Sequence, residues 1–284
     1  TLPAYVIRDV ALVDVDAGRV RPGMTVAVRA GRIVAVLPKA AATAYAGWPG
    51  IDGRGRHLLP GLWDSHVHTL ELSSRLHFPL LLASGVTSIR NLGDGCSWRS
   101  HLACPPDALA WQRDGAAALG PAIIASTGHH VEDLASAADA APLVRQLRAR
   151  RDDFVKIQLD DETPPELVAA LFAAAHAANL PVAGHFPTGT DLADPRFARL
   201  VSLEHDHQLM PQCRRRADGC AALLALLAAR RTAYVPTHVA SSAQDVRLGT
   251  NPAGEERALA HATGPVALAW RLYRLLHRAG RDAT

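Results

Sequence analysis

The sequence predicts an α/β protein with a (β/α)8 TIM-type barrel and a small β-rich part before it. Residues 1–56 alternate apolar and polar positions in short bursts, whereas from residue 57 short apolar stretches alternate with helical ones. Ala, Leu and Val dominate a composition with only 5% aromatic residues, as in proteins whose helices pack on a sheet. A chain of 284 residues is long enough for one large barrel with a small appendage.

Residues 1–56 are predicted to form strands and hairpins. The stretches AYVIRDVALVDV and MTVAVRAGRIVAVLP show the two-residue period of a strand, without a helical period. Turn signals lie at Ala17–Gly18 and Ala30–Gly31. We therefore expect a first domain at 1–56 that consists mainly of β-strands.

Residues 57–284 are predicted to form the barrel, because strands that alternate with helices in one direction build a parallel sheet. We expect its strands at 57–68, 85–93, 122–128, 153–159, 181–187, 201–207 and 232–239. We expect helices at 72–83, at 105–119, in the segment that ends near residue 151, at 164–178 and at 254–279. These seven βα units are one short of an eight-fold barrel, so we expect the chain to be truncated before strand eight.

The charge pattern argues against several classes of protein. The formal net charge is +3, and the sequence has no block of basic residues and no apolar run of membrane-spanning length. We therefore expect a soluble protein with no nucleic-acid partner and no membrane partner. No GxGxxG follows an early strand, which argues against a nucleotide-binding Rossmann protein. Formation of a homo-oligomer stays open.

The four cysteines fall in two local pairs, Cys96 with Cys104 and Cys213 with Cys220. Neither pair has the CxxC spacing of a zinc or redox motif, so we expect no structural metal site there. Each pair could close a short loop as a disulfide, which would indicate an oxidising compartment. Four free thiols in a cytosolic enzyme are the equal alternative, so a cytoplasmic and a periplasmic or secreted location both stay open.

The stretch HLLPGLWDSHVHT at 57–69 carries the strongest signal for a site. Successive side chains of a strand point to opposite faces, so His66 and His68 project from the same face and can bind one ion. Imidazole is a common neutral metal ligand, and the apolar residues before the pair are expected to bury the site. Two histidines brought together by chance are the alternative, which Asp64 and the Pro60–Gly61 step argue against.

The residues Pro60, Gly61, Asp64, His66 and His68 form a PGxxDxHxH pattern. This pattern resembles the first barrel strand of the metal-dependent amidohydrolase superfamily. The stretches GVTSIRNLG, DDFVKIQ and VPTHV are similar to the imidazolonepropionase-like and Xaa-Pro dipeptidase-like branch of that superfamily. The resemblance implies that 1–56 is the N-terminal part of a small β-sandwich beside the barrel.

Lys156 lies in the fourth predicted strand and shares its inward face with Phe154 and Gln158. Val155 and Ile157 are expected to face the helices. A lysine inside a barrel is costly unless it is paired or chemically changed, because desolvation disfavours the ammonium. The resemblance implies that Lys156 is carboxylated and that the carbamate bridges two divalent ions. An unmodified Lys156 that pairs with a buried carboxylate is the alternative.

The resemblance also implies the other metal ligands. His66 and His68 would hold one ion, and His185 and His205, at the ends of the fifth and sixth predicted strands, would hold a second. The expected metal is Zn²⁺, with one or two divalent ions per chain. A single-ion centre without lysine carboxylation is an alternative.

Further residues are expected around these ligands. His207 shares a face with His205 and is the rival for its place, but the resemblance puts the ligand directly after Glu204. Asp64 and Glu204 are expected to orient the histidines. His130, after the third predicted strand, is carried over from the resemblance as a substrate-binding residue.

The implied function is metal-dependent hydrolysis of an amide bond in a small peptide or N-acyl amino acid by a metal-activated hydroxide. A lactone, a cyclic amide or a phosphoester would suit the same centre. The superfamily's eighth strand carries an aspartate that acts as general base and then acid, and this sequence stops before that strand. Without it we expect little hydrolysis, because positioned acid–base groups contribute roughly two to four orders of magnitude in rate. A catalytically inactive barrel or fragment with a binding role is therefore the rival.

Overall fold

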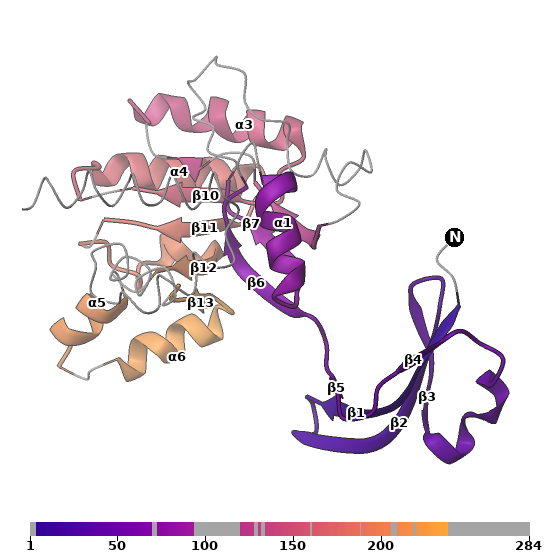
Figure 1. Ribbon diagram of the computed structural model, residues 1–284. Helices are drawn as coiled ribbons and strands as arrows, with labels where there is room; N and C mark the ends of the chain where they lie inside the picture. The colour runs from indigo at the N-terminus through magenta and orange to yellow at the C-terminus, as the bar shows by residue number, and fades with distance from the viewer. Residues whose placement is uncertain are drawn as a thin grey trace, which may run out of the picture. The chain divides into compact units, whose positions relative to one another are not determined.

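The computed structural model divides into two compact units, Thr1–Leu62 and Trp63–Thr284 (Figure 1). The structure describes residues 4–69, 73–93, 120–127, 130–131, 134–159, 161–187, 189–205, 209–217 and 220–237.

The first unit is built on one five-stranded sheet with the order β3-β2-β1-β4, in which β5 also pairs with β1. Its elements are β1 (Tyr5–Asp14), β2 (Arg19–Arg29), β3 (Arg32–Pro38), the 3-10 helix η1 (Lys39–Tyr45), β4 (Gly50–Asp52) and β5 (His57–Leu58). Strands β1, β2 and β3 pair antiparallel in sequence order. Ala30 and Gly31 have φ of 50° and 75°, the positive values that a tight two-residue hairpin turn needs. The strands and hairpins predicted for this part are confirmed.

The segment expected to be one barrel strand at 57–68 is two strands. β5 pairs in parallel with β1 of the first unit, and β6 (Leu62–Val67) begins after a break that contains Pro60. Proline has no N–H to contribute to a sheet, which accounts for the break. The prediction of a single strand is therefore wrong. His66 lies in β6, and His68 follows it directly.

The second unit is an α/β structure with parallel sheets. Its strands are β6, β7 (Val86–Asn91), β8 (Ala122–Ser126), β9 (His130–Val131), β10 (Val155–Gln158), β11 (Val182–His185), β12 (Leu200–Glu204) and β13 (Ala233–Val235). One sheet has the order β6-β7-β8 and the other the order β13-β12-β11-β10-β9. The pairs from β9 to β13 are parallel, as is β7 with β8. Each predicted barrel strand has a counterpart, but within the described residues they form two sheets rather than one closed barrel.

Helices follow most of these strands. They are α1 (Ser73–Ala83), the 3-10 helix η2 (Ala137–Asp139), α3 (Ala140–Arg150), α4 (Pro165–Ala177), the 3-10 helix η3 (Pro195–Arg199), α5 (Leu209–Arg215) and α6 (Ala221–Ala229). α4 begins with a proline at its first position, where the missing N–H leaves no bond unmade. The helices expected at 105–119 and 254–279 lie outside the described residues.

The alternation along β10 separates two cores. Val155 and Ile157 belong to the main cluster, together with apolar residues of α3, α4 and α6. α3 and α4 lie side by side next to β10 and β11 (Figure 1). Phe154 instead packs with Leu92 and Ala183 in a separate small cluster. The inward face predicted for this strand is therefore confirmed, and Lys156 lies on it.

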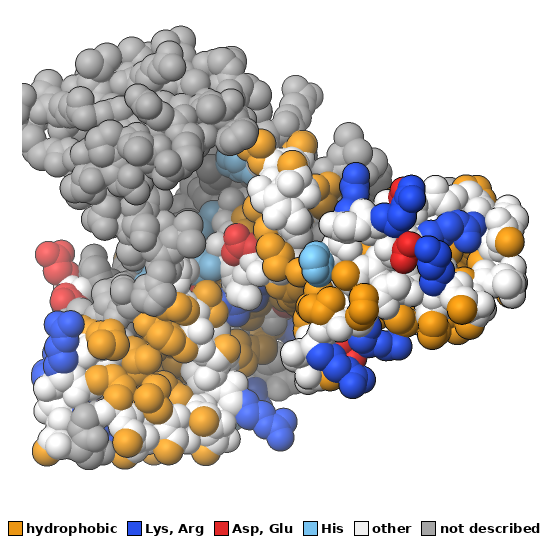
Figure 2. Space-filling model, turned by 60° about the horizontal axis from the view of Figure 1, so that its bottom comes forward, with side chains coloured by type: hydrophobic (Ala, Val, Ile, Leu, Met, Phe, Trp, Pro, Cys, Tyr) orange, Lys and Arg blue, Asp and Glu red, His pale blue; other side chains and the backbone are white. Residues whose placement is uncertain are grey.

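The surface of the second unit includes exposed apolar side chains. Figure 2 shows hydrophobic side chains grouped on one face of the molecule. Trp63 is 63% exposed, and Leu62, the last residue of the first unit, is 51% exposed. Leu62 and Trp63 themselves are therefore exposed, whereas the side chain of His66 is only 9% exposed. None of the described helices is long and apolar enough to span a membrane.

Asn91 ties the carboxyl ends of three strands together. Its Oδ1 accepts hydrogen bonds from the backbone N–H of Thr69 (3.1 Å) and of Gly93 (3.3 Å). Its Nδ2 donates to Ser126 Oγ (2.9 Å) and to the carbonyl of Thr127 (3.2 Å). The side chain is completely buried. An amide is needed here, because the side chain must accept hydrogen bonds from backbone N–H groups on one side and donate to oxygen atoms on the other.

We expect Asn91→Asp to lower the free energy of unfolding by about 3 kcal/mol, because a buried carboxylate would face the Thr127 carbonyl with no proton to donate. Denaturant unfolding measures the loss. Asn179→Asp is the matched control, since Asn179 is exposed and its Oδ1 only accepts, from Arg199. Equal stability losses in the two variants would contradict this account of Asn91.

Candidate metal centre

The predicted histidine ligands lie at or just after the carboxyl ends of strands from both sheets, whereas Lys156 is the second of the four residues of β10. Lys156 is in β10 and pairs in register with Ala183 of β11, and two residues further along His185 is opposite Gln158. His66 is in β6, and His205 follows β12 directly. In (β/α)8 barrels the active site is built from residues at the carboxyl ends of the strands.

The four imidazole rings form a chain of neighbours. The ring centroids of His66 and His68 are 5.3 Å apart, and those of His185 and His205 are 5.0 Å apart. His66 and His205 connect the two pairs, with their ring centroids 4.6 Å apart. The structure therefore brings together four histidines that span 140 positions of the sequence.

The ring spacing suits histidines that share a metal ion in pairs. Two imidazoles on one tetrahedral zinc ion have centroids about 5 Å apart, given the Zn–N distance and the tetrahedral angle. Among the described residues, no group of three or more His, Cys, Asp and Glu side chains is placed to hold a metal ion. The two findings are compatible, because each expected ion takes only two histidines and shares Lys156. The roles of these histidines and of Lys156 as ligands stay a prediction.

Lys156 is the only lysine of the second unit, and its side chain is 0% exposed. Its Nζ lies 3.4 Å from the carbonyl oxygen of Ile157. Burial disfavours the ammonium form of a lysine and favours the neutral amine. A neutral amine is the form that can react with carbon dioxide.

The backbone around two of the histidines has unusual geometry. Gly184, directly before His185, has φ +148°, and a Cβ added to it would lie 2.0 Å from the carbonyl oxygen of Ile157. No other residue fits there, so β11 approaches β10 closely where His185 is positioned. His205 has φ +65°, which is uncommon outside glycine, and its N–H donates to the carbonyl of Val235 (2.8 Å).

A buried carboxylate holds the ring of His66. The Nδ1 of His66 is 2.7 Å from Glu204 Oε2, and the Glu204 side chain is completely buried. Arg90 and Ser202 donate to the other oxygen, Oε1, each at 2.5 Å. Burial alone would raise the pKa of Glu204, but the hydrogen bond from His66, the charge of Arg90 and the hydrogen bond from Ser202 lower it. Glu204 is therefore an ionised acceptor that orients His66, as expected.

His205 is held in a similar way by a hydroxyl group. Its Nδ1 lies 2.7 Å from Thr237 Oγ1, in the segment that follows β13. Asp64, which was also expected to orient a histidine, instead accepts a hydrogen bond from the backbone N–H of His66 (3.0 Å). This contact of Asp64 is with the main chain rather than with an imidazole ring.

Two predicted residues are only partly described or not described, and three contact residues were not predicted. His207 lies outside the described residues, and for His130 only the backbone is described, in β9, where it is in register with Lys156. Sequence reasoning missed Arg90, Ser202 and Thr237. Arg90 had a detectable signal, since it is a charged residue near the carboxyl end of a largely buried strand.

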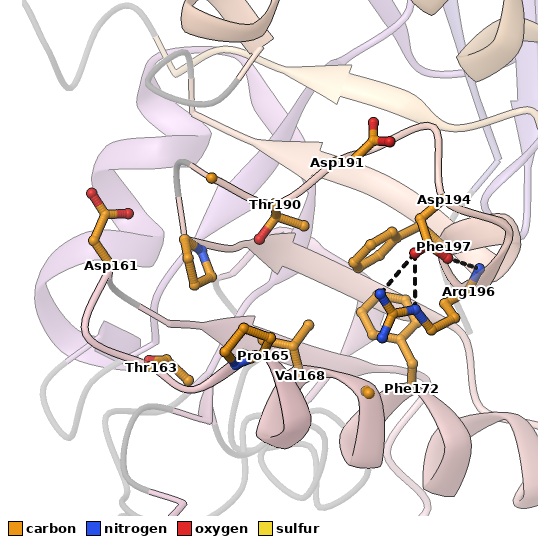
Figure 3. Close-up of a pocket in the computed structure, with 13 residues that line it drawn as sticks. Asp161, Thr163, Pro165, Val168, Phe172, Thr190, Asp191, Asp194, Arg196 and Phe197 are labelled. Atoms are coloured by element: carbon orange, nitrogen blue, oxygen red, sulfur yellow. Dashed lines mark hydrogen bonds and ion pairs between the residues drawn. The ribbon is translucent and has the colours of Figure 1, made fainter.

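A cavity of about 610 Å³ lies beside the loops that follow β10 and β11 (Figure 3). Its apolar wall includes Val168 and Phe172 of α4 and Phe197 of η3, and the two phenyl rings meet edge to face at 4.6 Å. Its charged lining residues are Asp161, Asp191, Asp194 and Arg196.

Of the charged residues that line this cavity, Asp194 and Arg196 form an ion pair with each other. Arg196 donates to Asp194 from Nε (3.0 Å) and Nη2 (2.7 Å), and the side-chain hydrogen bond lowers the pKa of Asp194. Asp191 accepts a hydrogen bond from the backbone N–H of Ala193 (2.9 Å). A backbone N–H carries no full positive charge, so this contact does not neutralise the carboxylate. Pro187, another lining residue, is two positions after His185, so their Cα atoms lie within about 7 Å.

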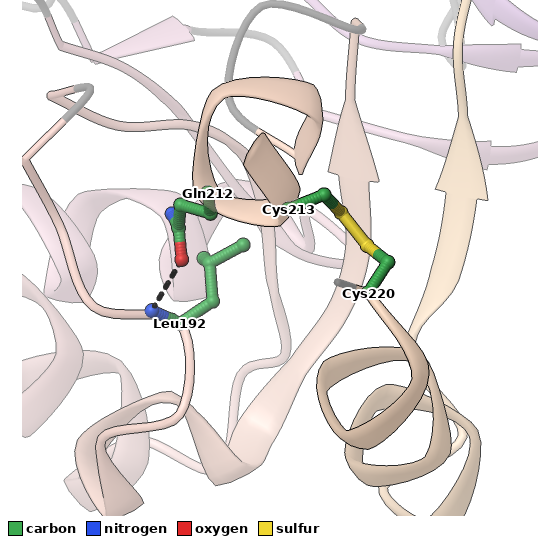
Figure 4. The surroundings of a disulfide bond; sticks show 4 residues. All are labelled: Leu192, Gln212, Cys213 and Cys220. Atoms are coloured by element: carbon green, nitrogen blue, oxygen red, sulfur yellow. Dashed lines mark hydrogen bonds between the residues drawn. A yellow bond between two sulfur atoms is a disulfide. The ribbon is translucent and has the colours of Figure 1, made fainter. Parts of the chain in front are cut away.

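A disulfide joins Cys213 of α5 to Cys220, the residue before α6 (Figure 4). No described cysteine is free, and Cys96 and Cys104 lie outside the described residues. Next to it, Gln212 accepts from the N–H of Leu192 (3.3 Å) and donates to the carbonyl of Thr190 (2.7 Å). Gln212 thus ties the loop after β11 to α5, and the disulfide ties α5 to the start of α6.

Comparison with solved structures identifies the fold. A Xaa-Pro dipeptidase with bound methionine is 18% identical with a TM-score of 0.60, and the match covers 88% of this chain and 70% of that one. A protein from Bifidobacterium longum assigned as a prolidase is 23% identical with a TM-score of 0.53, covering 77% and 59%. The chain has the fold of the amidohydrolase superfamily. This confirms the resemblance that the motifs indicated.

Curated relatives of the amidohydrolase superfamily match only a short part of the chain. Adenine deaminase from Rubrobacter xylanophilus is 50% identical over 68 residues, which is 24% of this chain and 11% of that protein. Adenine deaminase 3 from Rhizobium meliloti is 40% identical over 63 residues, again 11% of its length. The chain thus matches about a tenth of the length of these relatives. No protein-family model matches the chain.

Proposed function

We propose that the chain is a metal-dependent hydrolase that cleaves an amide bond in a small peptide or an N-acyl amino acid. The observation that supports this most directly is that two neighbouring histidine pairs lie at the carboxyl ends of the strands and that the lysine in β10 is buried. In this proposal His66 and His68 hold one Zn²⁺ ion, His185 and His205 hold a second, and carboxylated Lys156 is shared. The dipeptidase-like branch is proposed from the sequence motifs.

The side chains of this centre have separable tasks. Bound divalent ions would lower the pKa of water and polarise the scissile carbonyl. Glu204 keeps the His66 ring in place through Nδ1, which directs the other ring nitrogen to the ligand position. Thr237 does the same for His205. Lys156 is buried, and carboxylation would replace its charged amine by the carbamate that the two ions share.

The cavity beside α4 is the proposed space for the part of the substrate that lies away from the reacting bond, since none of the proposed ligands lines it. Its phenyl and valine wall suits an apolar side chain, and its aspartates suit a positive charge. A substrate with a free amino group, as in a peptide, is therefore favoured over an anionic one.

Asp191→Asn tests the contribution of that charge. We expect KM for a dipeptide with a free amino group to rise about fivefold, which corresponds to roughly 1 kcal/mol for one exposed charge pair. For the same dipeptide with its amino group acetylated, KM should stay the same. A rise of equal size for both substrates would show that Asp191 does not select for positive charge.

A second candidate reaction is hydrolytic deamination of an aminopurine. The only support is the match to adenine deaminases over 68 residues. Adenine therefore belongs in the substrate set, together with Xaa-Pro and other dipeptides, N-acyl amino acids, a lactone and a phosphoester.

The proposed function is tested by measuring metal content and hydrolysis on the same preparation. We expect one or two zinc ions per chain, and turnover of an amide substrate that a chelator abolishes and added zinc restores. His66→Ala should lose metal and activity, whereas His176→Ala, which removes an exposed histidine of α4, should lose neither. A folded protein without stoichiometric metal would contradict the proposal and favour a barrel with a binding role.

A further inference from the structure

A charge network connects β6, β7 and β12 next to the metal centre. Arg90 of β7 donates from Nη2 to Glu204 Oε1 (2.5 Å) and from Nη1 to Ser202 Oγ (2.8 Å). Its Nε donates to the carbonyl of Ser65 in β6 (2.8 Å). The Ser202 hydroxyl in turn donates to Glu204 Oε1. All three guanidinium nitrogens of Arg90 therefore donate hydrogen bonds, one to β6 and two to β12.

This network leaves one oxygen of Glu204 for His66. Oε1 accepts from Arg90 and Ser202, and Oε2 is 2.7 Å from His66 Nδ1. A carboxylate that accepts from a guanidinium is ionised and can only accept, so Nδ1 of His66 must be the donor. The other nitrogen of the neutral ring, Nε2, then carries the lone pair that binds a metal.

Burying this charged network costs free energy of desolvation, so it is not an efficient way to hold strands together. The Glu204 carboxylate is 0% exposed, and its partners Arg90 and Ser202 are mostly buried. Taking an ion pair out of water costs several kcal/mol per ion, and well-packed apolar residues often stabilise a fold equally well or better. A role in orienting His66 would explain why a charged pair, Glu204 with Arg90, is buried here.

We propose that Arg90 is a positioning residue of the metal centre, which acts through Glu204 to keep His66 in the tautomer with the proton on Nδ1. The link to metal binding rests on the proposed function, but the tautomer is a property of the metal-free protein. A lysine at this position keeps the charge but not the three directed donors. Arg90 does not touch the reacting atoms.

The test compares Arg90→Met and Arg90→Lys with Arg230→Met. Arg230 is the matched control, because it is also half-buried and donates to two carbonyl groups, of Leu192 and Ala193, away from the histidines. Proton–nitrogen correlation spectra of the metal-free protein report the tautomer of His66, and calorimetry reports the zinc affinity.

For Arg90→Met we expect a mixture of His66 tautomers and zinc binding weaker by about 10- to 100-fold, the usual effect of losing a group that orients a ligand. Arg90→Lys should recover part of the affinity, and Arg230→Met should leave both readings unchanged. A folded Arg90→Met protein with one His66 tautomer and unchanged zinc affinity would overturn the inference.

If Arg90→Met does not fold, Arg90→Lys decides, because an unchanged His66 tautomer and an unchanged zinc affinity in that variant also overturn the inference. One further outcome separates this inference from the proposed function. If the natural protein binds no zinc but Arg90→Met still mixes the tautomers, the proposed function fails while the positioning of His66 by Arg90 holds.

Discussion

Replacing Lys156 by methionine is expected to remove metal and activity without destabilising the fold. The side chain of Lys156 is 0% exposed, and methionine fills a similar volume without an ionisable group that must be kept from water. Activity should fall by roughly two to four orders of magnitude, as for other positioned catalytic groups. The free energy of unfolding should stay the same or rise. Metal analysis, steady-state kinetics and denaturant unfolding on one preparation measure all three quantities.

Lys39→Met is the control for this experiment. Lys39 is the other lysine of the chain, 67% exposed and paired with Asp9 at 2.5 Å in the first unit. It should lose no metal, and at most about 1 kcal/mol of stability. Isotopically labelled bicarbonate should give a carbamate signal in the natural protein that Lys156→Met lacks. Full metal content and activity in Lys156→Met would show that this lysine is a structural residue.

Gly184→Ala is expected to cause the largest loss of stability. An added Cβ would lie 2.0 Å from the carbonyl oxygen of Ile157 and 2.8 Å from its backbone nitrogen, and φ of +148° is open to glycine alone. Neither strand can yield, because β10 and β11 are paired through their backbones here. We expect a loss of about 4 kcal/mol in the free energy of unfolding, with the displaced His185 weakening metal binding.

Gly189→Ala provides the comparison. An added Cβ at Gly189 would meet nothing within 4 Å, so the stability should change by less than about 0.5 kcal/mol. Thermal or denaturant unfolding of both variants decides the matter. A Gly184→Ala protein as stable as Gly189→Ala would mean that β10 and β11 are not as close as the structure has them.

The sequence pattern predicted most strands of the second unit and the inward face of β10, because the two-residue period and turn signals are local. It also placed His66, His185 and His205 at strand ends, where the structure brings their rings together. Their roles as ligands, and the carboxylation of Lys156, stay predictions. The hairpins of the first unit followed from glycine-containing turns, which set the backbone directly.

Other features depended on contacts that no local pattern contains. The pairing of β5 with β1 uses residues nearly fifty positions apart, so the stretch before Pro60 was assigned to the wrong sheet. Arg90 meets Glu204 across 114 positions, and Thr237 meets His205 across 32. The cavity lined by Asp191 arises from loops after two strands. Such partners follow from tertiary packing and could not be read from spacing.

The most direct test of the metal centre is a crystal structure grown with zinc, with anomalous scattering recorded at the zinc edge. We expect one or two strong peaks about 2.0–2.1 Å from imidazole nitrogens of the His66–His68 and His185–His205 pairs. In the two-ion case, extra density should lie on Nζ of Lys156 between the peaks. Zinc found only elsewhere on the chain, with these four rings and Lys156 unliganded, would contradict it.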